Sequence, residues 1–197
     1  MREMDNKTIR AFFAIPISAD CRHEIDMVVS SLKNELTPCI RWVDVKNLHI
    51  TLKFLGEFKQ SDVAPIMNRL EANLSKINQF EIIFQNLGVF PNEWNPRVVW
   101  IGITFPHNLK QLFEEIEKTG FSLGYPKEER GFSPHITIGR VKKAAQNQDL
   151  IRIGKVIQNR MPYEICKSQV KGITLFQSRL SPSGPLYSEL FSIGFKE

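Results

Sequence analysis

Two short segments of this chain repeat the same combination of side chains. Residues 49–52 read His-Ile-Thr-Leu, and residues 135–138 read His-Ile-Thr-Ile. The histidines at 49 and 135 lie nearly half the 197-residue chain apart, which suggests two similar halves rather than a short repeat. Because each copy pairs an imidazole with a hydroxyl at the same spacing, the repeat predicts one chemical role served twice.

Strand geometry gives this spacing a meaning. In a β-strand, residues i and i+2 point to the same face, so His49 and Thr51 are predicted to stand side by side. The same holds for His135 and Thr137. The isoleucine between them points the other way, where it can anchor the strand in a core. If the two halves face each other across a cleft, the site holds two imidazoles and two hydroxyls with approximate two-fold symmetry.

These groups suit the hydrolysis of a phosphodiester by in-line attack. Such a reaction needs a base where water enters and an acid where the alcohol leaves, and two imidazoles on opposite sides provide both. An unperturbed histidine pKa of about 6.5 lets one copy be neutral and the other protonated near neutral pH. The hydroxyls of Thr51 and Thr137 can donate hydrogen bonds to non-bridging phosphate oxygens. The scheme needs no cofactor and no metal, and the four histidines lack the close spacing of metal-binding motifs.

Other side chains near the motifs are candidates for binding substrate. The planar guanidinium of Arg140 could hold a phosphate, with a solvated surface charge as the alternative. Phe132 could stack on a terminal base or belong to the core. Lys53 either helps to hold phosphate or faces solvent. The first copy has Phe54 where the second has Arg140, so the symmetry of the predicted site is incomplete.

The composition is that of an ordinary folded protein with an excess of positive charge. Hydrophobic residues make up 42% and charged residues 24%, which excludes a disordered or collagen-like chain. A net charge of +5 favours an anionic partner such as phosphate or nucleic acid. No GxGxxG or P-loop motif supports binding of ATP or NAD. The longest apolar stretch, residues 11–17, is far shorter than the roughly 20 residues that a bilayer requires.

The ends of the chain and the cysteines indicate a compartment. The charged N-terminus lacks the layout of a secretory signal, so we expect a cytoplasmic protein. We also expect it to be a monomer. Cys21, Cys39 and Cys166 are an odd number without a CxxC pair. This pattern predicts reduced thiols rather than a disulfide framework or a zinc site.

Short β-branched and aromatic runs alternate with amphipathic stretches of helix length, which predicts mixed α and β structure. Helices are expected at residues 19–36, 61–74, 109–123 and 147–158, with Ser61 as the cap of the second. Strands are expected at residues 8–17, 41–45, 48–55, 80–90, 98–103, 135–141, 163–175 and 186–195. No linker rich in Pro, Gly or Ser divides the chain, so a single domain is predicted. The pattern leaves open which half the segment from Tyr163 onward completes.

The two motifs also carry a family resemblance. His49-Ile-Thr-Leu-Lys-Phe-Leu-Gly56 and Phe132-Ser-Pro-His-Ile-Thr-Ile-Gly-Arg140 resemble the paired His-x-Thr-x motifs of the 2H phosphoesterase superfamily. The most similar branch is the RNA 2',3'-cyclic phosphodiesterases, historically named 2'-5' RNA ligases. The resemblance runs from about Thr8 to Arg140, with further matches at residues 10–16, 42, 89–91 and 96–100.

The resemblance implies a fold and an activity. The fold is α+β and bilobal, with an antiparallel sheet and helices in each of two pseudo-symmetric lobes, a cleft between them, and residues 1–197 as a single domain. The activity is hydrolysis of a terminal RNA 2',3'-cyclic phosphate to a 2'-phosphomonoester, with weak 2'-5' ligase activity as a possible accompaniment.

Residue roles follow from the same resemblance. His49 would donate a proton to the leaving 3'-oxygen, and His135 would be the base that activates water. The substrate-binding residues would be Thr51, Thr137, Arg140 and Phe132. Two alternatives stay open. One is a 2H phosphodiesterase for small cyclic nucleotides or 2'-5' oligonucleotides, and the other is a non-catalytic module that binds RNA or nucleotides.

Overall fold

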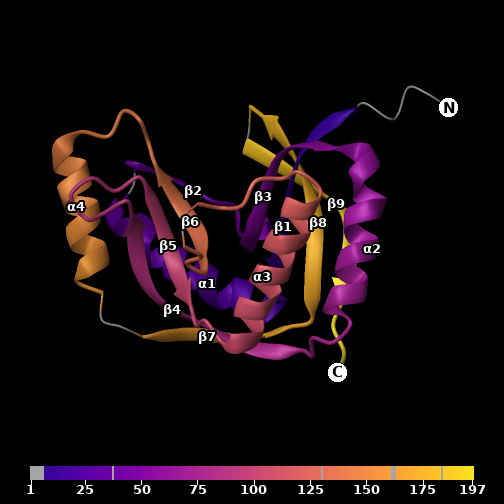
Figure 1. Ribbon diagram of the computed structural model, residues 1–197. Helices are drawn as coiled ribbons and strands as arrows, with labels where there is room; N and C mark the ends of the chain where they lie inside the picture. Colours follow the sequence, from indigo (N-terminus) through magenta and orange to yellow (C-terminus); the bar gives the residue numbers. More distant parts are fainter. Residues whose placement is uncertain (1–6, 37, 130, 161–162, 183) are drawn as a thin grey trace.

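Two antiparallel sheets and four α-helices make up the part of the chain that the structure describes (Figure 1). The structure is a computed structural model, and it describes residues 7–36, 38–129, 131–160, 163–182 and 184–197. The helices are α1 (Ala19–Leu36), α2 (Val63–Leu74), α3 (His107–Ser122) and α4 (Asn147–Gln158). The strands are β1 (Thr8–Pro16), β2 (Ile40–Trp42), β3 (His49–Lys59), β4 (Phe80–Phe90), β5 (Val98–Ile103), β6 (His135–Val141), β7 (Glu164–Val170), β8 (Gly172–Ser181) and β9 (Gly184–Gly194).

The sheets define two lobes. Lobe 1 contains the sheet β3-β1-β8-β9, with α3 packed against β3 and α2 against α3 and β9. Lobe 2 contains the sheet β2-β6-β5-β4-β7, with α1 packed against β7 and α4 against β4. The predicted α+β, two-lobed fold is therefore confirmed. None of the described helices is long and apolar enough to cross a membrane.

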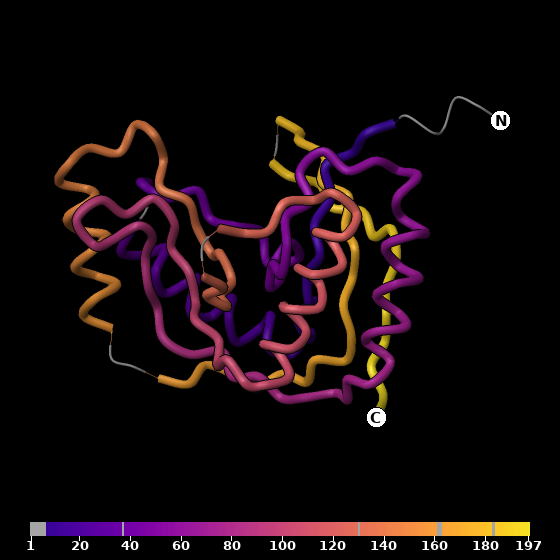
Figure 2. Tube along the Cα trace, viewed as in Figure 1, coloured from indigo at the N-terminus to yellow at the C-terminus, as the bar shows by residue number. Residues whose placement is uncertain are grey.

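The chain passes repeatedly from one lobe to the other (Figure 2). Strands β1 and β3 belong to lobe 1, although α1 and β2, which lie between them in sequence, belong to lobe 2. The last two strands, β8 and β9, return to lobe 1 after β4 to β7 have completed lobe 2. The two lobes are thus not consecutive halves of the chain, because each lobe takes its strands from widely separated parts of the sequence.

The predicted strand at residues 163–175 is in fact two strands in different sheets. β7 pairs with β4 in lobe 2, and β8 pairs with β1 in lobe 1, with Lys171 between them. Gly172 is required where β8 begins, because a Cβ there would lie 2.2 Å from the carbonyl oxygen of Ile193. The C-terminal segment therefore completes both sheets. The sequence could not show this because strand-forming residues flank Lys171 on both sides.

The predicted cap of the second helix is also wrong. Ser61 lies in a short 3-10 turn, Gln60–Asp62, and α2 begins at Val63. Asp62 occupies the N-cap position without a side-chain capping bond. Its carboxylate instead accepts a hydrogen bond of 2.5 Å from the hydroxyl of Tyr125. A tertiary contact thus takes the place of the local one that the sequence predicted.

Two of the cysteines are paired. Cys21 on α1 and Cys166 on β7 form a disulfide with a Cα–Cα distance of 5.7 Å, inside the range usual for such bonds. The expectation that all cysteines are reduced is therefore wrong, and only Cys39 is a free thiol. The partners are 145 positions apart, and they meet because α1 packs against β7. No local spacing could have revealed that contact.

Candidate active site

The first motif lies on β3, next to β1. The pairing of these strands places His49 and Thr51 on the same face of the sheet as Phe12. Ile50, between them, is fully buried on the other face. The alternation expected from the sequence is therefore present, and the core anchors the strand through the residue between the two polar groups.

Aromatic rings surround His49. Its ring centroid lies 4.8 Å from that of Phe12 and 5.2 Å from that of Tyr187, whose ring stands perpendicular to it. Phe176 lies slightly farther away, at 6.4 Å. These contacts restrict the orientation of the imidazole and shield part of it from water. Tyr187 lies on β9, and no pattern in the sequence indicated that it would meet a residue 138 positions earlier.

The second motif lies on β6, next to β5. Thr137 pairs with Trp100, and the register places His135 on the same face. Ile136 is fully buried on the opposite face. The ring of His135 lies 5.1 Å from that of Phe90 in an edge-to-face arrangement and 6.3 Å from that of Trp100. The two motifs therefore share the strand alternation and an aromatic wall beside the histidine.

Both histidines make the same backbone hydrogen bond. Nδ1 of His49 lies 2.7 Å from the carbonyl oxygen of Asn47, and Nδ1 of His135 lies 2.7 Å from that of Ser133. A carbonyl oxygen only accepts, so Nδ1 carries the proton and donates in both cases. The bond fixes each ring and leaves Nε2 as the nitrogen that can give or take a proton. The duplication thus extends from residue types to the contact that orients them.

A β-bulge follows the threonine in both motifs. One extra residue, Leu52 in β3 and Ile138 in β6, interrupts the register with the neighbouring strand. Strict alternation would point the residue three positions after each threonine to the opposite face, and the bulge reverses that. Phe54 pairs with Phe12, and Arg140 pairs with Val98, which shares a face of β5 with Trp100. Both side chains therefore lie on the face that carries the histidines.

The charge of Arg140 connects the two lobes electrostatically. Burial lowers the pKa of His49, the hydrogen bond to Asn47 opposes this, and the positive charge of Arg140 lowers the pKa further. Arg140 also acts on Tyr187, whose pKa is raised mainly by burial. Strands β3 and β6, which carry the two motifs, are in contact across the lobes. The structure brings Arg140 close to the first motif, as a shared phosphate site requires.

Phe54 is the counterpart of Arg140 in the first motif. Its side chain is 66% exposed, and its ring lies 5.9 Å from that of Phe12. An exposed aromatic ring beside the histidine offers a surface on which a nucleobase can stack. The sequence showed only that Phe54 breaks the symmetry. It did not predict the face on which Phe54 lies, because nothing in the residue pattern indicates the bulge.

Phe132 packs against helix α3. Its ring stacks on Phe113 with a centroid distance of 4.2 Å and meets Phe105 edge-on at 5.4 Å. This packing matches the core alternative for one face of the ring. Stacking of Phe132 on a terminal base stays a prediction.

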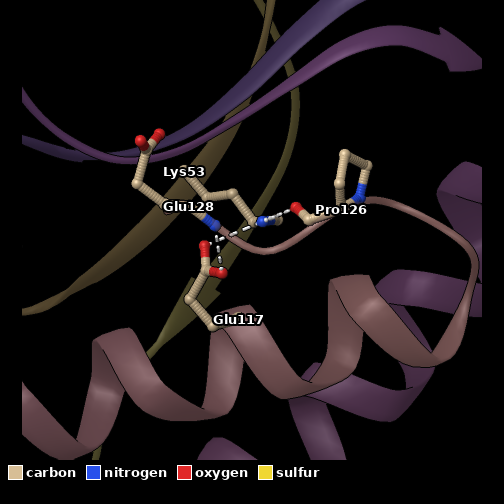
Figure 3. Close-up of polar contacts among 4 residues, drawn as sticks. All are labelled: Lys53, Glu117, Pro126 and Glu128. Atoms are coloured by element: carbon tan, nitrogen blue, oxygen red, sulfur yellow. Dashed lines mark hydrogen bonds and ion pairs between the residues drawn. The ribbon is translucent and has the colours of Figure 1, made fainter. Parts of the chain in front are cut away.

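Lys53 is buried beneath the first motif, with 4% of its surface exposed. Its Nζ donates to Oε1 of Glu117 at 2.8 Å and to the carbonyl oxygen of Pro126 at 2.7 Å (Figure 3). Oε2 of Glu117 accepts from the backbone N–H of Glu128 at 2.9 Å. Lys53 therefore neither holds phosphate nor faces solvent. Because it pairs with the core residue Phe13, it points away from the histidine face.

Within the residues that the structure describes, no group of three or more His, Cys, Asp or Glu side chains is placed to hold a metal ion. The other two histidines, His23 on α1 and His107 on α3, are exposed.

The chain matches a family model and several named relatives. The model of LigT-like phosphoesterases matches residues 15–100 and 103–187. An RNA 2',3'-cyclic phosphodiesterase of Methanocaldococcus jannaschii is 35% identical, over 91% of this chain and 96% of that protein. A protein of the same name from Methanothermobacter thermautotrophicus is 31% identical, over 92% of this chain and 96% of the relative.

Solved structures share the fold. The crystal structure of TT0787 of Thermus thermophilus matches with a TM-score of 0.78 and 25% identity, covering 94% of this chain and 97% of that one. Escherichia coli LigT complexed with 3'-AMP matches with a TM-score of 0.75 and 24% identity, covering 97% and 100%. The arrangement of two lobes is thus common to these proteins.

Proposed function

Since the chain belongs to the family of LigT-like phosphoesterases, we propose that it hydrolyses a terminal 2',3'-cyclic phosphate of RNA to a 2'-phosphomonoester. The relatives at 31% and 35% identity bear the name of this activity. The structural observation that carries the proposal is the matched pair of Nδ1 hydrogen bonds, which leaves Nε2 of His49 and His135 available for proton transfer. Phosphate binding alone would not need two oriented imidazoles.

The proposed reaction divides the proton transfers between the two histidines. Nε2 of His135 takes a proton from water, and the water oxygen attacks phosphorus in line with the P–O3' bond. That bond breaks, and the Nε2–H of His49 gives its proton to the leaving 3'-oxygen. The hydroxyls of Thr51 and Thr137 donate to the non-bridging oxygens, where charge develops. The phosphate stays on the 2'-oxygen, and one water is consumed.

Electrostatics give a reason why His49 is charged only when substrate is bound. In the free protein, burial and Arg140 keep its pKa below the ordinary value, so the neutral form dominates at neutral pH. An anionic phosphate beside the ring favours the charged form and raises the pKa. Substrate binding therefore favours protonation of His49, and this proton is the one that the leaving 3'-oxygen needs. Arg140 holds the phosphate and, until it arrives, disfavours the charged histidine.

The effect of Arg140 predicts a shift in the titration of His49. In Arg140→Gln, the positive charge that opposes protonation is gone, so the pKa of His49 should rise towards the ordinary histidine value. The measurement is the pH dependence of the His49 Cε1–H resonance in the free protein, with the exposed His23 as an internal reference. A pKa of His49 that stays unchanged or falls would show that the two groups do not interact.

The reaction itself is tested by the product. The protein is incubated with an oligoribonucleotide that ends in a 2',3'-cyclic phosphate, in the presence of a chelator, and the terminus is identified. We expect a 2'-phosphate, formed at the same rate with and without the chelator. A 3'-phosphate would show that the 2'-oxygen is the leaving group, which contradicts the proposal. Loss of activity with the chelator would reveal that a metal is required. Cyclic mononucleotides and 2'-5' dinucleotides, offered in parallel, test the alternative substrates.

The proposal also covers the oligomeric state, the base contacts and the location of the protein. Every group in the proposed mechanism comes from one chain, which supports a monomeric enzyme of a single two-lobed domain. Phe54 and Phe132 are proposed to contact the terminal base, and Phe54 is the more exposed of the two. A cytoplasmic location fits an RNA substrate. Weak 2'-5' joining would be the same step with the 5'-hydroxyl of a second RNA attacking phosphorus in place of water.

A further inference from the structure

Two arginines lie directly opposite each other on neighbouring strands of lobe 2. The register of β2 with β6 pairs Arg41 with Arg140, and both side chains are exposed. Residues directly opposite on antiparallel strands have Cβ atoms about 4.5 to 5.5 Å apart, and like charges in this position destabilise the sheet. They also share a face, so Arg41 lies on the side of lobe 2 that carries His135 and Thr137.

Among the described residues, no carboxylate forms an ion pair with either arginine. In the described part of the chain, every ion pair within 4.0 Å uses another cation, and neither Arg41 nor Arg140 contacts an acidic side chain. β2 forms the edge of the sheet, so the outer side of Arg41 has no further strand beside it. Two adjacent guanidinium groups without an acidic partner form a site complementary to phosphate, which guanidinium binds in a bidentate manner.

The position of the pair relative to the histidines indicates which phosphate it binds. Arg140 lies on the same strand and the same face as His135 and Thr137, and therefore near the reacting phosphate. Arg41 lies one strand farther from β5, at the edge of lobe 2. A nucleic acid that places its last phosphate at the histidines has its next phosphate one nucleotide towards the 5' end. An edge strand leaves room for that chain to continue outward.

We propose that Arg41, beside Arg140, binds the phosphodiester on the 5' side of the terminal nucleotide. This inference rests on the proposed function and assigns a substrate class to it. The enzyme acts on oligonucleotide ends in preference to cyclic mononucleotides, which have no such phosphodiester. Arg41 contributes to binding and takes no part in the proton transfers.

The test compares two substrates that differ by one nucleotide on the 5' side, which brings this phosphodiester with it. One is adenosine 2',3'-cyclic phosphate, and the other is the ApA dinucleotide that ends in the same cyclic phosphate. The measured quantity is the ratio of kcat/KM for the dinucleotide to that for the mononucleotide. We expect the wild type to favour the dinucleotide and Arg41→Gln to lower the ratio about tenfold, equivalent to about 1.4 kcal/mol. Arg41→Lys should keep part of the preference, because it keeps the charge and loses the bidentate geometry.

Arg69→Gln provides the matched control. It removes the same charge from an exposed arginine on α2, which lies at the other side of the molecule from β2 (Figure 1). Its ratio should equal that of the wild type. An unchanged ratio in Arg41→Gln, or an equal fall in both variants, would overturn the proposal. A wild type that hydrolyses both substrates without preference would also overturn it while leaving the proposed function intact, whereas hydrolysis of neither would refute the proposed function itself.

The same repulsion gives a measurement that is independent of activity. If the role of Arg41 were to stabilise the fold, Arg41→Gln would unfold at a lower temperature than the wild type. Because Arg41 faces Arg140 without an acidic partner, we expect the unfolding midpoint to stay the same or to rise at low ionic strength. A clear fall would assign Arg41 a structural role and contradict the proposal.

Discussion

Replacing either motif histidine by alanine is expected to lower kcat by about 10²- to 10⁴-fold, the usual contribution of a general acid or base. In His49→Ala the leaving 3'-oxygen departs without a proton, and in His135→Ala water attacks without a base. Each backbone carbonyl that accepts from Nδ1 loses its partner, but both histidines lie on the polar face of their strand, with the buried isoleucine beside them unchanged. The fold should therefore persist.

Single-turnover rates and the far-UV spectrum together check this prediction. His107→Ala is the matched control, because His107 is exposed on α3 and takes no part in the site. The double variant should be little worse than the slower single variant, since both histidines serve the same step. Activity retained in either single variant would exclude a mechanism with two histidines. Strictly additive losses would indicate that the two act in separate steps.

Breaking the buried ion pair should have the largest effect on stability. In Lys53→Met, Glu117 keeps its charge in a site where its side chain is only 9% exposed, and the carbonyl oxygen of Pro126 loses its donor. Removing one partner of a buried pair typically costs about 3 to 5 kcal/mol. The same applies to Glu117→Gln, which leaves Lys53 charged and leaves one amide oxygen to accept from both Nζ of Lys53 and the N–H of Glu128. We expect each variant to lower the free energy of unfolding by several kcal/mol.

A double-mutant cycle separates the pair from its surroundings. Lys53→Met combined with Glu117→Gln leaves no buried charge, so it should cost clearly less than the sum of the two single changes. The exposed pair Lys110–Glu114 on α3 is the control, and Lys110→Met should cost less than about 1 kcal/mol. Urea unfolding measures all four variants. Additive single and double costs would show that the two buried groups do not stabilise each other.

The buried pair also joins elements of different parts of the site. Lys53 belongs to the strand of the first motif, and residues 126–128 lie in the segment that leads to the second motif. The space for the lysine stem comes from Gly120, where a Cβ would lie 2.8 Å from Cε of Lys53. A destabilised pair is thus expected to affect both motif strands, and not α3 alone.

The sequence predicted the features that depend on the regular spacing of side chains along one strand or one helix. The alternation of His49, Ile50 and Thr51 follows from strand geometry alone, and the structure places these side chains accordingly. Helices α1 and α4 have their predicted bounds because the apolar spacing of each is regular over its full length. These features depend on neighbouring residues in the chain, so they can be deduced without knowing the tertiary structure.

What the sequence could not predict depends on contacts between distant residues. The direction of Lys53 is set by a bulge at Leu52 and by an acidic partner on α3. Tyr187 meets His49 only because β9 closes the sheet of lobe 1. The break at Lys171 falls between two segments that both favour strands, and only the pairing partners distinguish them.

The passage of the chain between the lobes determines when the first motif can be completed during synthesis. β8 lies between β1 and β9 in the sheet of lobe 1, and both late strands fall within residues 172–197. On the ribosome, every strand of lobe 2 is made before the chain that completes lobe 1. A nascent chain therefore carries both histidines before Phe176 and Tyr187 can pack beside His49, and that part of the aromatic wall forms only when β8 and β9 have left the exit tunnel.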